Sequence, residues 1–203
     1  MATLILDREL AEKIRLKRAE CGGDRWDEVW EGTYVMAPLP NNEHQEFVSK
    51  LASILYLVVD WNRDTVLAGT NVSDRRQDWT HNYRCPDVAV YLYGNPAKNC
   101  GTHWLGGPDM AIEVVSPDDR SYDKIPFYES VGTRELLLID RHPWQIELLR
   151  LDGDQLVSAG VSRPEDQHAI HSMVLPITFQ LLPASGRPQL VVSVVGDDRR
   201  WII

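Results

Sequence analysis

Residues 85–93 read CPDVAVYLY, and residues 110–116 read MAIEVVS. Both are short apolar runs bounded by Pro, Gly or Ser, which is the pattern of buried strands. Each run carries one carboxylate, Asp87 in the first and Glu113 in the second. A charged carboxylate in a buried strand is costly unless it is paired with a cation or coordinates a metal. These two runs therefore predict two buried strands of the central sheet and a site built on their carboxylates.

The two carboxylates can converge if their strands are neighbours. Alternation of side chains places Asp87 on one face of its strand with Ala89, and Glu113 on one face of the other strand with Ala111. Two hard oxygen donors with open positions suit Mg²⁺ or Mn²⁺ rather than zinc. The sequence thus predicts a divalent-metal site at Asp87 and Glu113, with the backbone carbonyl of Val114 as a candidate third donor.

A structural interpretation competes with the metal site. Asp87 follows a proline at the start of a strand, where an aspartate can simply cap a turn. Glu113 can form an ion pair with Arg84 or Arg134.

A lysine follows the second run. Lys124 lies 11 residues after Glu113, near the start of the next expected helix, from where its ammonium can lean back over the strand ends. Metal ions held by carboxylates activate water and stabilise charge on phosphorus, and a nearby lysine can orient that water or neutralise the phosphate. Phosphodiester hydrolysis is therefore the favoured reaction. The plainer interpretation of Lys124 is a solvated lysine in the first turn of a helix.

Helices and further strands surround these runs. Residues 7–20 read as an amphipathic helix, and a wide apolar stripe predicts a central helix from about residue 42 to 60. Residues 26–36 resemble a small hairpin, residues 95–107 a loop, and residues 118–132 carry a short helix. Further strands are expected at 66–72, 135–139, 146–151, 156–161, 174–182 and 190–195.

The order of elements predicts an α/β (α+β) protein. At 203 residues the chain is expected to form a single domain that buries about 70% of its surface without disulfides. A core over about 25–185 is then preceded by the helix 7–20 and followed by a β-rich C-terminal extension.

Charge and composition exclude several classes of protein. The net charge of −9 argues against sequence-independent coating of nucleic acid, although it leaves room for a local basic patch. The sequence shows no signal peptide, no apolar run long enough for a membrane span, and no CxxC pair among its three cysteines. Phosphate-binding loops, dinucleotide fingerprints, serine-hydrolase elbows and HExxH motifs are also absent from it. We therefore expect a cytoplasmic protein with no membrane association.

The ordered set Pro86-Asp87, Glu113 and Lys124 resembles the PD-(D/E)XK nuclease superfamily. Further blocks narrow the resemblance to the Uma-type family of restriction-endonuclease-like proteins, formerly catalogued as a domain of unknown function, over roughly residues 25–185. These blocks are Glu31-Gly32 with Tyr34-Val35-Met36, His44-Gln45, Arg84-Cys85-Pro86-Asp87, Glu113-Val114-Val115-Ser116-Pro117, Lys124 with Tyr128 and Gly132, Glu135 to Asp140, and Glu147 to Leu151.

The resemblance implies a restriction-endonuclease-like core in which a mixed central sheet is flanked by helices. It also implies a Mg²⁺- or Mn²⁺-dependent endonuclease that cuts DNA, with Asp87, Glu113 and Lys124 as catalytic residues. The superfamily's usual lysine position, two residues after the glutamate, is Val115 here, so the resemblance implies that Lys124 substitutes from the neighbouring helix. Many nucleases of the superfamily act as two-fold dimers, which implies a homodimer.

Two other functions remain open. One is a non-catalytic nucleic-acid- or protein-binding module that keeps the nuclease fold. The other is a metal-dependent hydrolase of small phosphate esters, against which a basic surface near the site would argue.

Four further residues keep two interpretations each. Glu43 and His44, near the start of the central helix, are either outer-shell partners of the metal site or ordinary core and capping residues. Trp79 and Trp104 fall in loops near the carboxylates, where they either pack or stack on a base.

Overall fold

The centre of the protein is a mixed six-stranded sheet. The structure, a computed structural model, describes residues 2–116 and 120–203. The strand order of this sheet is β13-β12-β11-β10-β7-β4, with β10 and β11 parallel and the other neighbours antiparallel. Its strands are β4 (Thr65–Ala68), β7 (Val88–Tyr91), β10 (Met110–Val114), β11 (Glu135–Arg141), β12 (Trp144–Asp152) and β13 (Gln155–Ser162).

The two carboxylate-bearing runs are neighbours in this sheet. Strands β7 and β10 pair antiparallel with Val88 opposite Ile112, so the register continued by one residue sets Asp87 opposite Glu113. The strand predicted over 85–93 is shorter than expected, and Asp87 lies one residue before its start. Asp87 and Glu113 therefore meet at the end of the β7–β10 ladder.

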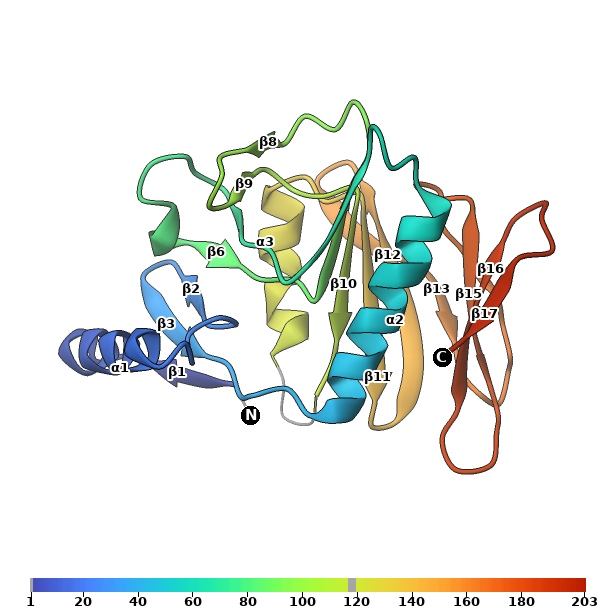
Figure 1. The fold of residues 1–203 in the computed structure, drawn as a ribbon, viewed down its shortest axis with the longest axis horizontal. Helices are drawn as coiled ribbons and strands as arrows, with labels where there is room; N and C mark the ends of the chain where they lie inside the picture. Colours follow the sequence, from blue (N-terminus) through green and yellow to red (C-terminus); the bar gives the residue numbers. More distant parts are fainter. Residues whose placement is uncertain (1, 117–119) are drawn as a thin grey trace.

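Helices cover both faces of the sheet, as expected for the core (Figure 1). On one face lies α2 (Asn42–Val58), whose Phe47, Leu51 and Leu55 are fully buried in the main apolar cluster. This helix begins where the Asn41 side chain accepts a hydrogen bond from the His44 N–H at 2.9 Å, which is an ordinary N-cap.

The short α3 (Ile125–Ser130) packs on the opposite face through Phe127 and Tyr128. A 3₁₀ turn over Ser121–Lys124 leads into it, and Pro126 falls in the first turn of the helix, where a proline is tolerated. The short helix expected within 118–132 is therefore present. Residues 117–119 lie outside the described residues.

A second, seven-stranded sheet flanks the core, in the order β1-β3-β2-β6-β5-β9-β8. It contains the predicted hairpin as β2 and β3. Its strands are β1 (Thr3–Ile5), β2 (Glu28–Trp30), β3 (Thr33–Met36), β5 (Val72–Ser73), β6 (Tyr83–Arg84), β8 (Lys98–Asn99) and β9 (Trp104–Leu105), and a 3₁₀ turn (Trp79–His81) lies between β5 and β6.

Two expectations for this region are wrong. The single strand expected over 66–72 divides into β4 and β5, which belong to different sheets. The chain turns between them at Gly69, which has a φ of +64° and lies so close to the Trp26 ring that a Cβ would be 1.8 Å from it. The segment 95–107, expected to be loop, contains the two-residue strands β8 and β9.

The β-rich C-terminal extension is confirmed as a four-stranded antiparallel sheet that shares the main core. Its Phe179, Leu181 and Val192 are fully buried in the same apolar cluster as helix α2. The strands are β14 (Ile170–His171), β15 (Ile177–Leu182), β16 (Gln189–Val194) and β17 (Arg200–Ile202).

The N-terminal helix α1 (Arg8–Glu20) extends away from the core at the other end of the molecule (Figure 1). The predicted helix is present, and it is capped by Asp7, which accepts a hydrogen bond from the Leu10 N–H at 2.9 Å. None of its residues is buried. Of the helices that the structure describes, none combines the length and the hydropathy needed to cross a membrane.

Candidate active site

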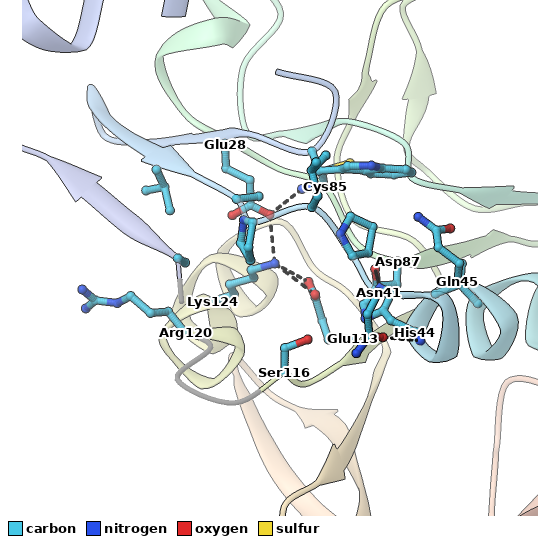
Figure 2. Close-up of a pocket in the computed structure, with 18 of the residues that line it drawn as sticks. Glu28, Asn41, His44, Gln45, Cys85, Asp87, Glu113, Ser116, Arg120 and Lys124 are labelled. Atoms are coloured by element: carbon cyan, nitrogen blue, oxygen red, sulfur yellow. Dashed lines mark hydrogen bonds and ion pairs between the residues drawn. The ribbon is translucent and has the colours of Figure 1, made fainter. Parts of the chain in front are cut away.

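A cavity of about 270 Å³ opens where β7 begins and β10 ends, between the two sheets and the start of α2. Figure 2 shows the side chains of Asp87, Glu113, Lys124, His44 and Glu28 pointing toward it. Four of these five residues are candidates from the sequence. The remaining lining residues are Ala2, Trp26, Trp30, Val35, Ala37, Pro38, Leu39, Pro40, Asn41, Gln45, Val48, Cys85, Ser116, Arg120 and Arg141.

The side chain of Asp87 accepts a backbone hydrogen bond from β10 at the point where the pairing of β7 with β10 stops. Its Oδ2 accepts a hydrogen bond from the Val114 N–H at 2.7 Å, and its Oδ1 lies 2.9 Å from Nε2 of His44. Because the N–H and C=O of one residue in a strand leave by the same edge, the Val114 carbonyl also faces the Asp87 side. The predicted capping role is thus present, yet the same carboxylate lines the cavity and remains 18% exposed.

Glu113 is a buried carboxylate with three polar contacts from two residues. Both of its oxygens lie 3.0 Å from Nζ of Lys124, and its Oε1 accepts a hydrogen bond from the Tyr128 hydroxyl at 2.6 Å. Burial raises the pKa of Glu113 to about 8. Lys124 and Tyr128 oppose the rise in this pKa, while the negative charges of Asp87 and Glu28 add to it.

The alternative ion pairs of Glu113 do not form. Arg134 instead pairs with Asp109 at 2.8 Å, and Arg84 donates to the backbone carbonyl of Val29 at 3.2 Å. The lysine, not an arginine, is the cation beside Glu113.

Lys124 is not a solvated first-turn lysine. It is the last residue of the 3₁₀ turn, its side chain is only 11% exposed, and its ammonium points back toward the end of β10. A second carboxylate, Glu28, lies 2.9 Å from the same Nζ. The Lys124 ammonium therefore lies over the strand ends, as the sequence predicted.

Glu28 was missed by the sequence analysis. It lies in β2, with a side chain that is 5% exposed, and accepts hydrogen bonds from the Cys85 N–H at 2.9 Å and from Trp30 Nε1 at 2.6 Å. The signal that identified Asp87 was present here too, because Glu28 is a carboxylate within a β-prone run. Its charged neighbours Asp27 and Glu31 concealed that signal.

The two outer-shell candidates on α2 differ in position. His44 contacts Asp87 directly through Nε2, and its Nδ1 is buried without a hydrogen-bond partner among the described residues. The Glu43 carboxylate instead pairs with Arg141 at 2.9 Å and lies 3.7 Å from Arg187. Of the two, His44 is the one placed to orient the site.

The tryptophans expected near the carboxylates have packing roles. Trp79 stacks on His103 with ring centres 4.9 Å apart, and Trp104 stacks on Tyr91 with ring centres 3.8 Å apart. Neither lines the cavity, whereas Trp30 does, with the Arg120 guanidinium 5.7 Å from its ring centre.

The donor set of the cavity fits a hard divalent cation. Within the described residues no group of three His, Cys, Asp or Glu side chains could hold a metal alone. The candidate ligands are two carboxylates, Asp87 and Glu113, with the Val114 carbonyl. Mg²⁺ typically binds through one or two carboxylates and keeps several waters, so this set is sufficient for it. Asp87 and the buried Glu28 and Glu113 place three acids beside one lysine, and a cation would offset this excess of acidic groups.

Comparisons with known proteins find a family and a solved structure that the chain resembles. The model of the family described as "Uma2: Putative restriction endonuclease" matches residues 16–185. The chain also resembles a crystal structure titled as a putative nuclease belonging to DUF820 from Anabaena variabilis ATCC 29413, with a TM-score of 0.57 and 21% identity over 72% of this chain and 80% of that one. No curated protein matches the chain in sequence. The expected restriction-endonuclease-like fold, a mixed sheet flanked by helices, is therefore confirmed.

Proposed function

Because the chain belongs to the Uma2 family of restriction-endonuclease-like proteins, we propose that it is a Mg²⁺- or Mn²⁺-dependent endonuclease that hydrolyses phosphodiester bonds in DNA. The observation that carries the proposal is the convergence of Asp87, Glu113 and Lys124 on one cavity. The pattern of these three residues in the sequence resembles that of nucleases, and their geometry fits the same chemistry.

Asp87 and Glu113 hold the cation in this proposal, with the Val114 carbonyl as a third oxygen donor. The bound cation supplies Lewis acidity and lowers the pKa of water. Asp87 is oriented by His44 and by the Val114 N–H, so that its free lone pairs face the cavity. Tyr128 fixes Glu113 from the opposite side. Such fixed partners reduce the reorganisation that the site needs during the reaction.

Lys124 supplies the positive charge that Val115 cannot. Its ammonium lies beside Glu113, where it can orient the attacking water or neutralise the phosphate as negative charge develops. The lysine holds a proton that it can share with a phosphate oxygen by hydrogen bonding. Lys124 therefore acts on the transition state and does not bind the cation.

The basic and aromatic side chains of the cavity favour a nucleic acid over a small phosphate ester. Arg120, whose side chain is 42% exposed, lines the cavity beside Trp30. An arginine next to an aromatic ring can engage a phosphate and a base of the same strand. The Arg120 guanidinium also pairs with Asp123 at 2.6 Å, so a bound phosphate would compete with that pair.

A plasmid-nicking assay tests the proposed function. Wild-type protein with Mn²⁺ should convert supercoiled plasmid into nicked and linear forms, and excess EDTA or Asp87→Asn should abolish this conversion. If wild-type protein binds DNA with no cleavage under any divalent cation, the binding-module hypothesis replaces the nuclease.

A further inference from the structure

Glu28 and Glu113 hold Lys124 between them. Its Nζ lies 2.9 Å from Oε1 of Glu28 and 3.0 Å from each carboxylate oxygen of Glu113 (Figure 2). The two acids come from different sheets, Glu28 from β2 and Glu113 from β10. Lys124 therefore joins the two sheets through its ammonium.

Glu28 is a fixed carboxylate. Its Oε1 accepts the Cys85 N–H at 2.9 Å and its Oε2 accepts the Trp30 indole N–H at 2.6 Å. The side chain is 5% exposed, and the guanidinium of Arg84 lies 4.6 Å from the Trp30 ring centre, which packs that ring in place. Glu28 thus has little freedom to turn toward a ligand elsewhere in the cavity.

Cation binding sets up a competition at Glu113. Both of its oxygens face Lys124 in the structure, so a divalent cation that takes one or both of them must displace part of this ion pair. The ammonium and the cation also repel each other. A buried ammonium that loses a partner is strongly destabilised unless another carboxylate remains beside it. For Lys124, that remaining carboxylate is Glu28.

We propose that Glu28 is a positioning residue that keeps Lys124 beside the cavity when Glu113 turns its oxygens to the cation. The proposal rests on the proposed function, because it assumes that Glu113 is a cation ligand. Glu28 itself touches neither cation nor substrate and acts through the lysine. The contact between Glu28 and Lys124 explains how the lysine can share Glu113 with a metal ion and still be held in the orientation that catalysis needs.

Chemical labelling of Lys124 tests this role without measuring activity. Intact folded protein is treated briefly with isotope-coded acetic anhydride, in EDTA or in saturating Mn²⁺, and acetylation of Lys124 is quantified by mass spectrometry. Lys50 is the internal reference, since its side chain is 46% exposed on α2. The proteins compared are wild type, Glu28→Gln and the control Glu31→Gln. Glu31 is an acid of the same hairpin, and its side chain is 67% exposed.

The labelling of Lys124 in wild type and Glu31→Gln should be low and nearly independent of Mn²⁺. In Glu28→Gln, Mn²⁺ should raise Lys124 labelling by about 10-fold, the scale expected for the loss of one charge-assisted contact. If Glu28→Gln does not fold, Glu28→Asp serves instead, because it retracts the carboxylate by one methylene and should show the same Mn²⁺-dependent rise.

Three results overturn the proposal and are distinguishable. If Mn²⁺ raises Lys124 labelling in neither wild type nor Glu28→Gln, although calorimetry shows Mn²⁺ binding, the metal site stands and Glu28 has no role in holding Lys124. A rise already present in wild type would mean that Glu28 itself has turned to the cation. If calorimetry shows no Mn²⁺ binding to wild type, the proposed metal site fails, and the inference falls with it.

Discussion

Nζ of Lys124 lies 3.0 Å from both carboxylate oxygens of Glu113, although the two residues are 11 positions apart in the chain. The contact forms because the 3₁₀ turn over Ser121–Lys124 returns the chain to the end of β10, where Glu113 is located. Val115, two positions after the glutamate, carries no charge. The cation beside Glu113 thus comes from another element of the fold.

Asp87→Asn should weaken Mn²⁺ binding by more than about 10-fold, since a neutral amide replaces one of two anionic ligands. Isothermal titration calorimetry on metal-free protein measures this affinity. Glu46→Gln is the control, because Glu46 is a half-exposed acid on α2 that pairs with Lys50. Equal Mn²⁺ affinity in wild type and Asp87→Asn would remove Asp87 from the site.

Tyr128→Phe should destabilise the protein by about 1–3 kcal/mol, because it deprives the buried Glu113 carboxylate of a hydrogen bond. The free energy of unfolding in urea measures the effect. Tyr93→Phe, at a residue that is 71% exposed, should change this free energy by less than about 0.5 kcal/mol. Indistinguishable unfolding curves for the two variants would show that the Tyr128–Glu113 bond adds nothing to stability.

The metal-free protein should lose stability as the pH rises from about 4.5 to about 8. The folded pKa of Glu113 is raised to about 8 by burial, against 4.5 for the free group, so in this range the folded state keeps a proton that the unfolded state releases. Unfolding is then favoured increasingly as pH rises. Glu113→Gln has no such proton to lose.

Urea unfolding in EDTA at several pH values checks this sign. The stability of wild type should fall more steeply with pH than that of Glu113→Gln, with Lys50→Ala following wild type. Parallel pH dependences for wild type and Glu113→Gln would mean that Glu113 is already ionised in the folded protein at low pH.

We also expect a homodimer, because a two-fold assembly matches the symmetry of a DNA duplex cut on both strands. Light scattering at micromolar concentrations should give a mass of twice the 23.2 kDa chain. A mass of one chain across this range would leave duplex cleavage to successive nicks by monomers.

The sequence was most informative where a charge interrupts an apolar strand. Asp87 and Glu113 could be identified as candidate site residues because each lies in an apolar run that forms a buried strand, and antiparallel pairing of β7 and β10 brings them together. Helix α2 was also predictable, since its cap and its apolar stripe are local features.

Features set by contacts distant in sequence were not predictable. The split of the strand expected over 66–72 depends on Gly69 passing under Trp26, a packing contact between residues far apart in the chain. Strands of two residues, such as β8 and β9, are too short to show alternation. Glu28 reaches the site from another sheet, so its contact with Lys124 could be seen only in the folded chain.

Lys124 is proposed to be catalytic although it lies outside the superfamily's usual lysine position. Lys124→Ala removes a charge that acts on the reacting phosphate, so it should reduce cleavage by roughly 10²–10³-fold while Mn²⁺ affinity is largely retained. Lys50→Ala, which removes an exposed lysine paired with Glu46, is the matched control.

The most direct measurement is the rate of plasmid nicking in saturating Mn²⁺ for wild type, Lys124→Ala, Lys50→Ala and Asp87→Asn. We expect wild type and Lys50→Ala to nick plasmid at equal rates and Asp87→Asn to be inactive. Lys124→Ala should nick roughly 10²–10³-fold more slowly than wild type. Equal nicking by Lys124→Ala and Lys50→Ala, with Asp87→Asn inactive, would contradict the catalytic role of Lys124.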